Sequence, residues 1–287
     1  MILNTKITSK VYVGHEFNTI NSLCLIEPTS IFVTGGTDSI IKLHTDDDLL
    51  NLPKEHNGSI NGIDYFKDNL ISVSSDGQLI NWDLVKQKKK LGYAKSKDNL
   101  TSCAKLNDRL WCCGGYNHRL YFYDSRVSKS FYSMNIGKDI INDINYKDQD
   151  VIGISNSDGC FYQIDLRNSN QIIDEYNKGS IMSNYYNDTL QKDLLFFENG
   201  DLVIDSFSIS TFKRNYKYNA QLIDYNGNHW IIAGNQSKID VWNYQEGYVD
   251  SLANNLVDVV SEVKFNKYGN QIIGTSSDKV VIWQNVF

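Results

Sequence analysis

Histidine, serine and aspartate occur in an order that could support nucleophilic catalysis. His56 is followed by Ser72, Ser74 and Asp76, and these residue types together could form a catalytic triad. The same residues could instead form a buried hydrogen-bond network, because buried polar groups need partners. The set recurs in degraded form elsewhere in the chain, which favours the structural interpretation. We therefore predict that His56, Asp76 and the following Trp82 serve the fold.

Other signatures of catalysis or metal binding do not occur in the sequence. No phosphate-binding G-x-x-x-x-G-K-[ST], no H-E-x-x-H and no G-x-S-x-G is found. The five cysteines have no C-x-x-C spacing, so we expect buried free thiols and neither a zinc site nor a disulfide framework. The acidic run at 45–50 and the basic run at 86–90 are expected to be solvated loops. We expect no cofactor, no metal and no enzyme activity.

Two arginines are candidates for partner binding. Arg126 ends GGYNHRLYFYDSR (114–126) and Arg167 ends SNSDGCFYQIDLR (155–167), two stretches of similar design 41 residues apart. Each arginine follows an aspartate by two residues and offers a planar fork of donors. The fork could bind the neighbouring aspartate or backbone carbonyls, or it could dock a partner, since arginines are frequent interface hot spots. Both interpretations stay open from the sequence.

These residues belong to a repeat that runs through the whole chain. The large residues near the ends of seven short alternating runs, from His44 to Trp283, lie 37 to 41 residues apart. Alternation at period two between polar turns indicates strands. A period of this size predicts the four-stranded blades of a β-propeller. A polar turn residue precedes each run: Asp38, Asp76, Asn117, Asp158, Asn199, Gln236 and Asp278.

The predicted fold class is all-β, a single seven-bladed propeller. We expect blades at about 14–52, 53–93, 94–132, 133–174, 175–214, 215–250 and 251–287, the last completed by residues 1–13. The last blade has no fourth strand of its own, whereas the first 13 residues hold a spare one. We predict that the two pair, because this closes the seam of the ring.

The repeat resembles the WD40 repeat. In that family a histidine at the blade entrance contacts a strand Ser or Thr and the turn Asp, and the residues at 56, 72 or 74, 76 and 82 match this pattern. The resemblance implies structural roles for Asp38, Asp158 and Asp278 as well. The chain lacks the Trp-Asp pair in most blades.

From about residue 10 to 284, the order of features is similar to the mitogen-activated protein kinase organizer family, WD-repeat proteins also associated with spliceosomes. The similar stretches include IINDINYKDQDVIGISNSDGCFYQIDLRNSN, the poorly formed FENGDLVIDSF and the final VVIW. This resemblance implies a scaffold for a splicing or kinase-signalling complex. The paired Asp-x-Arg boxes resemble those of substrate receptors for cullin-4 ubiquitin ligases, which is an alternative. A propeller hydrolase is a third.

We predict a protein-binding adaptor whose main surface is the face that carries the turn residues. Tyr116 is the best single candidate on that face, with core packing as its competing explanation. A net charge of −6 argues against nucleic-acid binding, and no signal peptide or apolar run of membrane-spanning length occurs. We expect a monomer in the cytoplasm or nucleus, with other proteins as partners and no small-molecule substrate or membrane. The predicted docking residues are Thr37, Ser75, Tyr116, Ser157, Glu198, Asn235 and Ser277, with Arg126 and Arg167 on a second rim.

Overall fold

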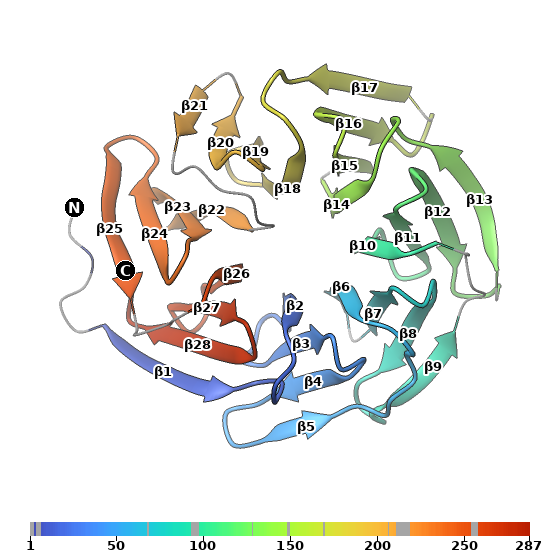
Figure 1. Cartoon of the computed structure of the whole chain (residues 1–287), viewed down its shortest axis with the longest axis horizontal. Helices are drawn as coiled ribbons and strands as arrows, with labels where there is room; N and C mark the ends of the chain where they lie inside the picture. Colours follow the sequence, from blue (N-terminus) through green and yellow to red (C-terminus); the bar gives the residue numbers. More distant parts are fainter. Residues whose placement is uncertain are drawn as a thin grey trace.

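The molecule is a ring of seven antiparallel sheets around a common axis (Figure 1). The computed structural model describes residues 3, 7–67, 69–92, 98–127, 129–147, 150–168, 170–205, 207–210, 219–253 and 258–287. Over these residues twenty-eight strands form seven four-stranded sheets. Each sheet is one blade, and we letter its strands a to d from the axis outward. Within the same residues, no helix is long and apolar enough to cross a membrane.

Consecutive strands of the chain build each blade. The first three blades are β2 (Ile20–Leu25), β3 (Phe32–Gly36), β4 (Ile41–His44) and β5 (Leu49–Asn51); β6 (Ile60–Phe66), β7 (Asn69–Ser74), β8 (Leu79–Asp83) and β9 (Lys88–Gly92); and β10 (Leu100–Lys105), β11 (Leu110–Gly115), β12 (Arg119–Asp124) and β13 (Ser130–Asn135). The next two are β14 (Ile141–Tyr146), β15 (Val151–Asn156), β16 (Cys160–Asp165) and β17 (Asn170–Glu175); and β18 (Ile181–Asn187), β19 (Lys192–Phe197), β20 (Asp201–Ile204) and β21 (Phe207–Ser210). The last two are β22 (Ala220–Tyr225), β23 (Asn228–Gly234), β24 (Lys238–Asn243) and β25 (Gly247–Ala253); and β26 (Val260–Asn266), β27 (Gln271–Ser276), β28 (Lys279–Gln284) and β1 (Thr8–Val13).

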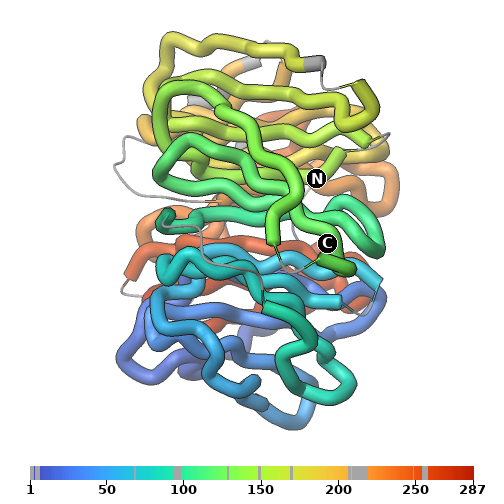
Figure 2. Tube along the Cα trace, turned by 90° about the vertical axis from the view of Figure 1, so that its right-hand side faces the viewer, coloured from blue at the N-terminus to red at the C-terminus, as the bar shows by residue number. Residues whose placement is uncertain are grey.

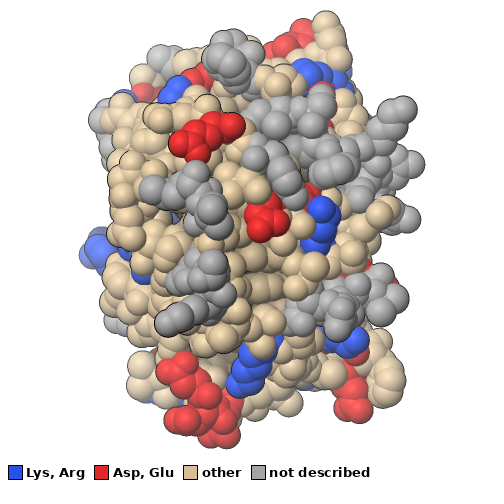
Figure 3. All heavy atoms as spheres, turned by 90° about the vertical axis from the view of Figure 1, so that its left-hand side faces the viewer, with Lys and Arg blue, Asp and Glu red and all other residues tan. Residues whose placement is uncertain are grey.

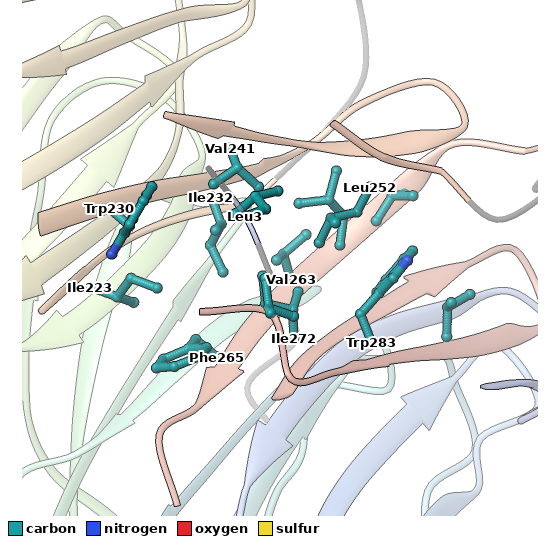
Figure 4. Packing of buried hydrophobic residues seen from close by; sticks show 14 residues of the cluster. Leu3, Ile223, Trp230, Ile232, Val241, Leu252, Val263, Phe265, Ile272 and Trp283 are labelled. Atoms are coloured by element: carbon teal, nitrogen blue, oxygen red, sulfur yellow. The ribbon is translucent and has the colours of Figure 1, made fainter. Parts of the chain in front are cut away.

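The strand nearest the amino terminus closes the ring. β1 pairs antiparallel with β28 over six residues, with Val11 opposite Val281. Leu3 is buried in the same region, in a cluster that includes Trp230 and Trp283 (Figure 4). The prediction of an all-β, seven-bladed propeller closed by its first strand is therefore confirmed.

The polar turn residues stabilise the turn between strands b and c. At five of the seven predicted positions, the side-chain oxygen accepts the backbone N–H of the residue two places later. Such short polar side chains favour turns because they can bind the local backbone. These bonds are Ile40 N to Asp38 (3.0 Å), Gln78 N to Asp76 (2.9 Å), Arg119 N to Asn117 (3.1 Å), Cys160 N to Asp158 (3.0 Å) and Asp201 N to Asn199 (2.9 Å).

Neighbouring blades are joined by apolar clusters and by hydrogen bonds between a strands. Between the third and fourth blades, for example, Leu120 and Phe122 pack with Ile152 and Tyr162. At four joints, a polar side chain of one a strand accepts a backbone N–H from the next. The four bonds are Lys105 N to Asp64 (2.6 Å), Ile144 N to Ser102 (3.1 Å), Asn184 N to Asp143 (3.2 Å) and Phe265 N to Gln221 (2.8 Å). The sequence period therefore places each acceptor beside its donor.

Candidate docking surfaces

A bulge in the a strand repeats around the ring and directs side chains to the mouth of the channel. In six blades the pairing of strands a and b shifts by one residue near the start of strand a. Such a bulge re-aims the extra residue. The six residues at this position are Asn21, Asn61, Thr101, Asn142, Met182 and Ser261, and all six line one cavity of about 450 Å³. The cavity opens on the face of the b–c and d–a loops, which we call the loop face.

Three of these bulge residues connect one blade to the next. Asn61 Nδ2 donates to the Leu100 carbonyl at 2.7 Å, and Asn142 Nδ2 donates to the Ile181 carbonyl at 2.8 Å. The Thr101 hydroxyl donates to the Ile141 carbonyl in the same way. These hydrogen bonds hold three of the polar groups that line the mouth in place.

The seven docking residues predicted around the channel mouth lie on this loop face, and they differ in how exposed they are. Thr37, Ser75, Tyr116 and Glu198 are exposed, and Ser157 and Ser277 are half-buried. Only Ser75 and Tyr116 line the cavity at the mouth. Asn235 is 4 % exposed, and its side chain accepts the Gln236 N–H at 2.5 Å and donates to Asp240. Asn235 therefore holds the turn of its blade.

Tyr116 is a surface residue. Its side chain is 53 % exposed, and its backbone N–H donates to the Asn99 carbonyl at 3.1 Å. The preceding Gly115 allows this approach, because a Cβ there would lie 2.1 Å from the Asn99 carbonyl oxygen. The alternative that Tyr116 packs in the core does not agree with this exposure.

Phe17 is a second exposed aromatic on the loop face, and the sequence did not indicate it. It lies in the d–a loop before β2, is 91 % exposed, and has a φ of 57°. A bulky residue in this left-handed region carries backbone strain of about 1–3 kcal/mol. Thr19, two residues later, lines the cavity that Tyr116 also lines. Tyr116 therefore lines the mouth itself, whereas Phe17 lies in a loop of the first blade that reaches the mouth through Thr19.

The other end of the channel holds a second cavity of about 430 Å³. Asn61, Thr101 and Glu262 line both cavities, so the two meet inside the ring. Asp64 lies in this second cavity, where burial raises the pKa of its carboxyl to about 6 even though two backbone N–H groups donate to it. Among the described residues, no group of His, Cys, Asp and Glu is arranged to hold a metal ion.

In the second blade the predicted histidine network is present, with His56, Ser72 and Trp82 buried and Asp76 partly exposed. His56 Nδ1 lies 3.2 Å from Asp76, and His56 Nε2 lies 2.8 Å from the Ser72 hydroxyl, which also accepts Trp82 Nε1–H at 2.8 Å. Burial raises the pKa of Asp76, but hydrogen bonds from His56 and from two backbone N–H groups outweigh it and lower the pKa to about 2. His56 is 1 % and Ser72 0 % exposed, so a substrate cannot reach the serine. The arrangement supports a structural network.

The first blade extends the same network by one member. His15 Nδ1 lies 2.8 Å from Asp38, and His15 Nε2 lies 2.9 Å from the Thr34 hydroxyl. His44 Nε2 lies 2.7 Å from the same hydroxyl, and His44 Nδ1 lies 2.9 Å from the Tyr12 hydroxyl on β1. Burial lowers the pKa of both histidines, that of His44 to about 3. His44 thus occupies the place of Trp82 and reaches the closing strand.

The two arginines each bind the aspartate two residues before them. Arg126 donates from Nε and Nη2 to the two oxygens of Asp124 at 2.8 and 2.5 Å, and Arg167 contacts Asp165 in the same way at 2.9 and 2.8 Å. These contacts lower the pKa of each aspartate to about 2. The arginine side chains remain 67 % and 58 % exposed, on the c–d turns of adjacent blades. Each guanidinium group therefore binds an aspartate of its own blade and still remains accessible to solvent.

Comparison with known proteins identifies the repeat. Residues 7–45, which span β1 and the first blade up to the end of β4, match the family model "WD domain, G-beta repeat". The molecule is a WD40-repeat β-propeller. WD40 propellers generally act as protein-interaction scaffolds and are usually non-catalytic. No curated protein matches the chain.

The matched segment of this WD40 propeller contains the whole network of the first blade, from Tyr12 to His44. It also contains Phe17, which no sequence motif marks. On the side of the disk that carries β1 and β25, charged side chains of both signs lie scattered among uncharged atoms (Figure 3). On the loop face, Phe17 and Tyr116 are exposed aromatic side chains.

Proposed function

We propose that this WD40 propeller is a non-catalytic scaffold that holds a protein partner on its loop face, with Phe17 and Tyr116 as anchors. The observation that carries the proposal is the exposure of these two aromatics on the loop face, where Tyr116 lines a mouth whose bulge residues are polar except for Met182. Large aromatic side chains that become buried on binding supply much of the energy of an interface. The strained backbone of Phe17 adds support, because such strain is concentrated at functional sites.

The resemblance to the kinase organizer family supports a finer proposal, in which the partner belongs to a spliceosomal or kinase-signalling assembly. A splicing component would place the protein in the nucleus, and a kinase module would place it in the cytoplasm. Affinity purification from the native cell with quantitative mass spectrometry distinguishes the two, because each assembly has its own set of proteins.

The same purification tests the docking face. The double variant Phe17→Ala with Tyr116→Ala should reduce the recovered partner by roughly tenfold or more, as expected for two hot-spot residues. Val85→Ala is the matched control, since Val85 is 86 % exposed in the c–d turn of the second blade, on the opposite face. Both variants should keep the wild-type melting temperature. Equal recovery from the double variant and the wild type would contradict the proposal.

A ligase-receptor function through Arg126 and Arg167 is the second candidate. The observation in its favour is that both guanidinium groups stay more than half exposed at equivalent positions of adjacent blades. If this candidate is correct, Arg126→Ala with Arg167→Ala abolishes binding to the cullin-4 adaptor while the loop-face variants leave it intact. Binding that survives the double arginine substitution would exclude this function for the pair.

A further inference from the structure

The outer wall of the propeller is formed by seven d strands, whose outward backbone groups are not paired within their own blades (Figure 1). An exposed edge of this kind can pair with another chain, and proteins protect it by shortness, charge, bulges or proline. An edge that lacks such protection can therefore indicate where a strand of a partner protein pairs with the propeller.

Six of the seven edges carry a protective feature. β5 has three residues and β21 has four. β9 carries three consecutive lysines, Lys88, Lys89 and Lys90, and β1 carries Lys10. The pairing of β13 and of β25 with the adjacent c strand is interrupted by a register shift, which twists the edge.

The edge of β17 is neither short nor interrupted, and its only charged residues, Asp174 and Glu175, lie together at its carboxyl end. All six of its residues pair with β16 without a shift in register. The strand NQIIDE contains no lysine, arginine, proline or glycine. β17 lies at the outer margin of the disk in both views of the chain (Figures 1 and 2). It is therefore a long, regular edge that is open to pairing.

Two large apolar side chains stand side by side on this edge. Ile172 is 60 % and Ile173 is 54 % exposed. Neighbouring residues of a strand point to opposite faces of the sheet. Ile173 lies opposite Tyr162, which packs against the third blade, and Ile172 lies opposite Gln163 on the other face. An added strand would cover both isoleucines at once.

The charged residues of β17 favour one chain direction for an added strand. Asp174 and Glu175 lie at the carboxyl end of β17, where Asp174 accepts a hydrogen bond from the Gln163 amide at 3.2 Å. At the other end, Arg167 is neutralised by its bidentate contact with Asp165. An antiparallel strand has its amino-terminal end beside Asp174 and Glu175, so basic residues there would complement the edge.

We propose that β17 accepts an extended segment of a partner protein as a fifth, antiparallel strand of the fourth blade. The segment has Lys or Arg near its amino end and β-branched residues at its centre. Backbone hydrogen bonds supply the affinity, and contacts with Ile172 and Ile173 supply the specificity. This surface is separate from the loop face, so the two can be occupied together.

A fluorescent synthetic peptide tests the proposal directly. The probe has about ten residues, with Lys-Arg at its amino end followed by alternating Thr and Val, a composition suited to strands. Ile173→Lys in the intact propeller should weaken its saturable binding by roughly tenfold or more. The control Val85→Lys places the same charge on another exposed apolar residue and should leave the affinity unchanged. Equal affinity of the wild type and Ile173→Lys would overturn the proposal.

Two altered probes separate strand addition from simple apolar adhesion. Methylation of alternate backbone nitrogens removes hydrogen-bond donors but keeps the side chains, and it should weaken binding by roughly tenfold. The reversed sequence, with Lys-Arg at the carboxyl end, should bind roughly fivefold more weakly. Hydrogen exchange of the β17 amides should slow only with the unmodified probe. Retained binding of the methylated probe would overturn strand addition.

Sedimentation of the protein alone distinguishes a partner strand from a second copy of the chain. We expect a monomer at micromolar concentration for the wild type and for Ile173→Lys. A wild-type dimer that Ile173→Lys dissociates would show that β17 pairs with itself, and the partner-strand proposal would be wrong. The outcome is independent of the loop face, because Phe17→Ala with Tyr116→Ala should not change binding of the peptide.

Discussion

The first and second blades contain the same chain of hydrogen bonds but end it differently. In the second blade the chain runs from Asp76 through His56 and Ser72 to Trp82. An indole only donates, so Trp82 ends the chain. In the first blade the imidazole of His44 replaces the indole and has a second nitrogen, which the Tyr12 hydroxyl reaches. The presence of His44 in place of the repeat's tryptophan thus adds a hydrogen bond to Tyr12.

In the side-chain network of the first blade, the residues at the two ends determine which group donates and which accepts in every hydrogen bond. Both histidines are neutral at pH 7 because burial lowers their pKa. Asp38 can only accept, so His15 donates from Nδ1 and accepts at Nε2 from Thr34. The Thr34 oxygen then accepts from His44 Nε2–H, which leaves His44 Nδ1 to accept from Tyr12. Tyr12 belongs to β1, so this chain connects the closing strand to the first blade.

The largest expected effect comes from removing the closing strand. Deletion of residues 1–13 exposes the edge of β28 and removes Tyr12 from the first blade, while the second blade keeps its whole network. We expect insoluble protein or a melting temperature lower by more than about 10 °C. Removal of residues 1 and 2 alone, which keeps Leu3 and β1, is the control. An unchanged melting transition after the longer deletion would refute closure by β1.

The central hydroxyls of the two networks should be equally important. Ser72→Ala and Thr34→Val each leave a buried ring N–H donor and a buried histidine acceptor without a partner. We expect each to lower the free energy of unfolding by about 2–3 kcal/mol. Chemical denaturation at pH 7 measures both. A loss in one blade only would show that the two networks are not equivalent.

The regular part of this fold could be predicted from the sequence, and the departures from regularity could not. The period and the turn residues led to seven blades because the Asp and Asn side chains act locally, on a backbone N–H two residues away. The contact of His44 with Tyr12 joins residues from strands of two different blades, so no local pattern reports it. Phe17 and the bulge residues were missed for related reasons, since an exposed loop residue has no periodic pattern and a one-residue bulge interrupts the alternation that marks a strand.

The third test uses pH to separate the two networks. His44 has a pKa of about 3 in the folded state, so between about 6.5 and 3 only the unfolded chain binds its proton. The stability that neutral His44 contributes is therefore fully present above pH 6.5. Below that pH the free energy of unfolding falls by up to about 1.4 kcal/mol per pH unit because of this residue. His44→Phe should lower stability at pH 7 and flatten its decline between pH 7 and 4.5. Trp82→Phe in the second blade should leave the slope as in the wild type. Equal slopes for all three proteins would contradict a neutral His44.

The smallest effect is expected at the hydrogen bond between Tyr12 and His44, which has no counterpart in the second blade. Tyr12→Phe removes one partly buried hydrogen bond to His44 and keeps the ring, so we expect a loss of about 0.5–1.5 kcal/mol in the free energy of unfolding. Tyr132→Phe is the matched control, because that side chain is 48 % exposed on the outer strand β13 and should tolerate the change. In a His44→Phe background Tyr12→Phe should cost less, since its acceptor is already gone. A loss of equal size in both backgrounds would mean that the Tyr12 hydroxyl does not act through His44, and the closing strand would then be held by the β28 ladder alone.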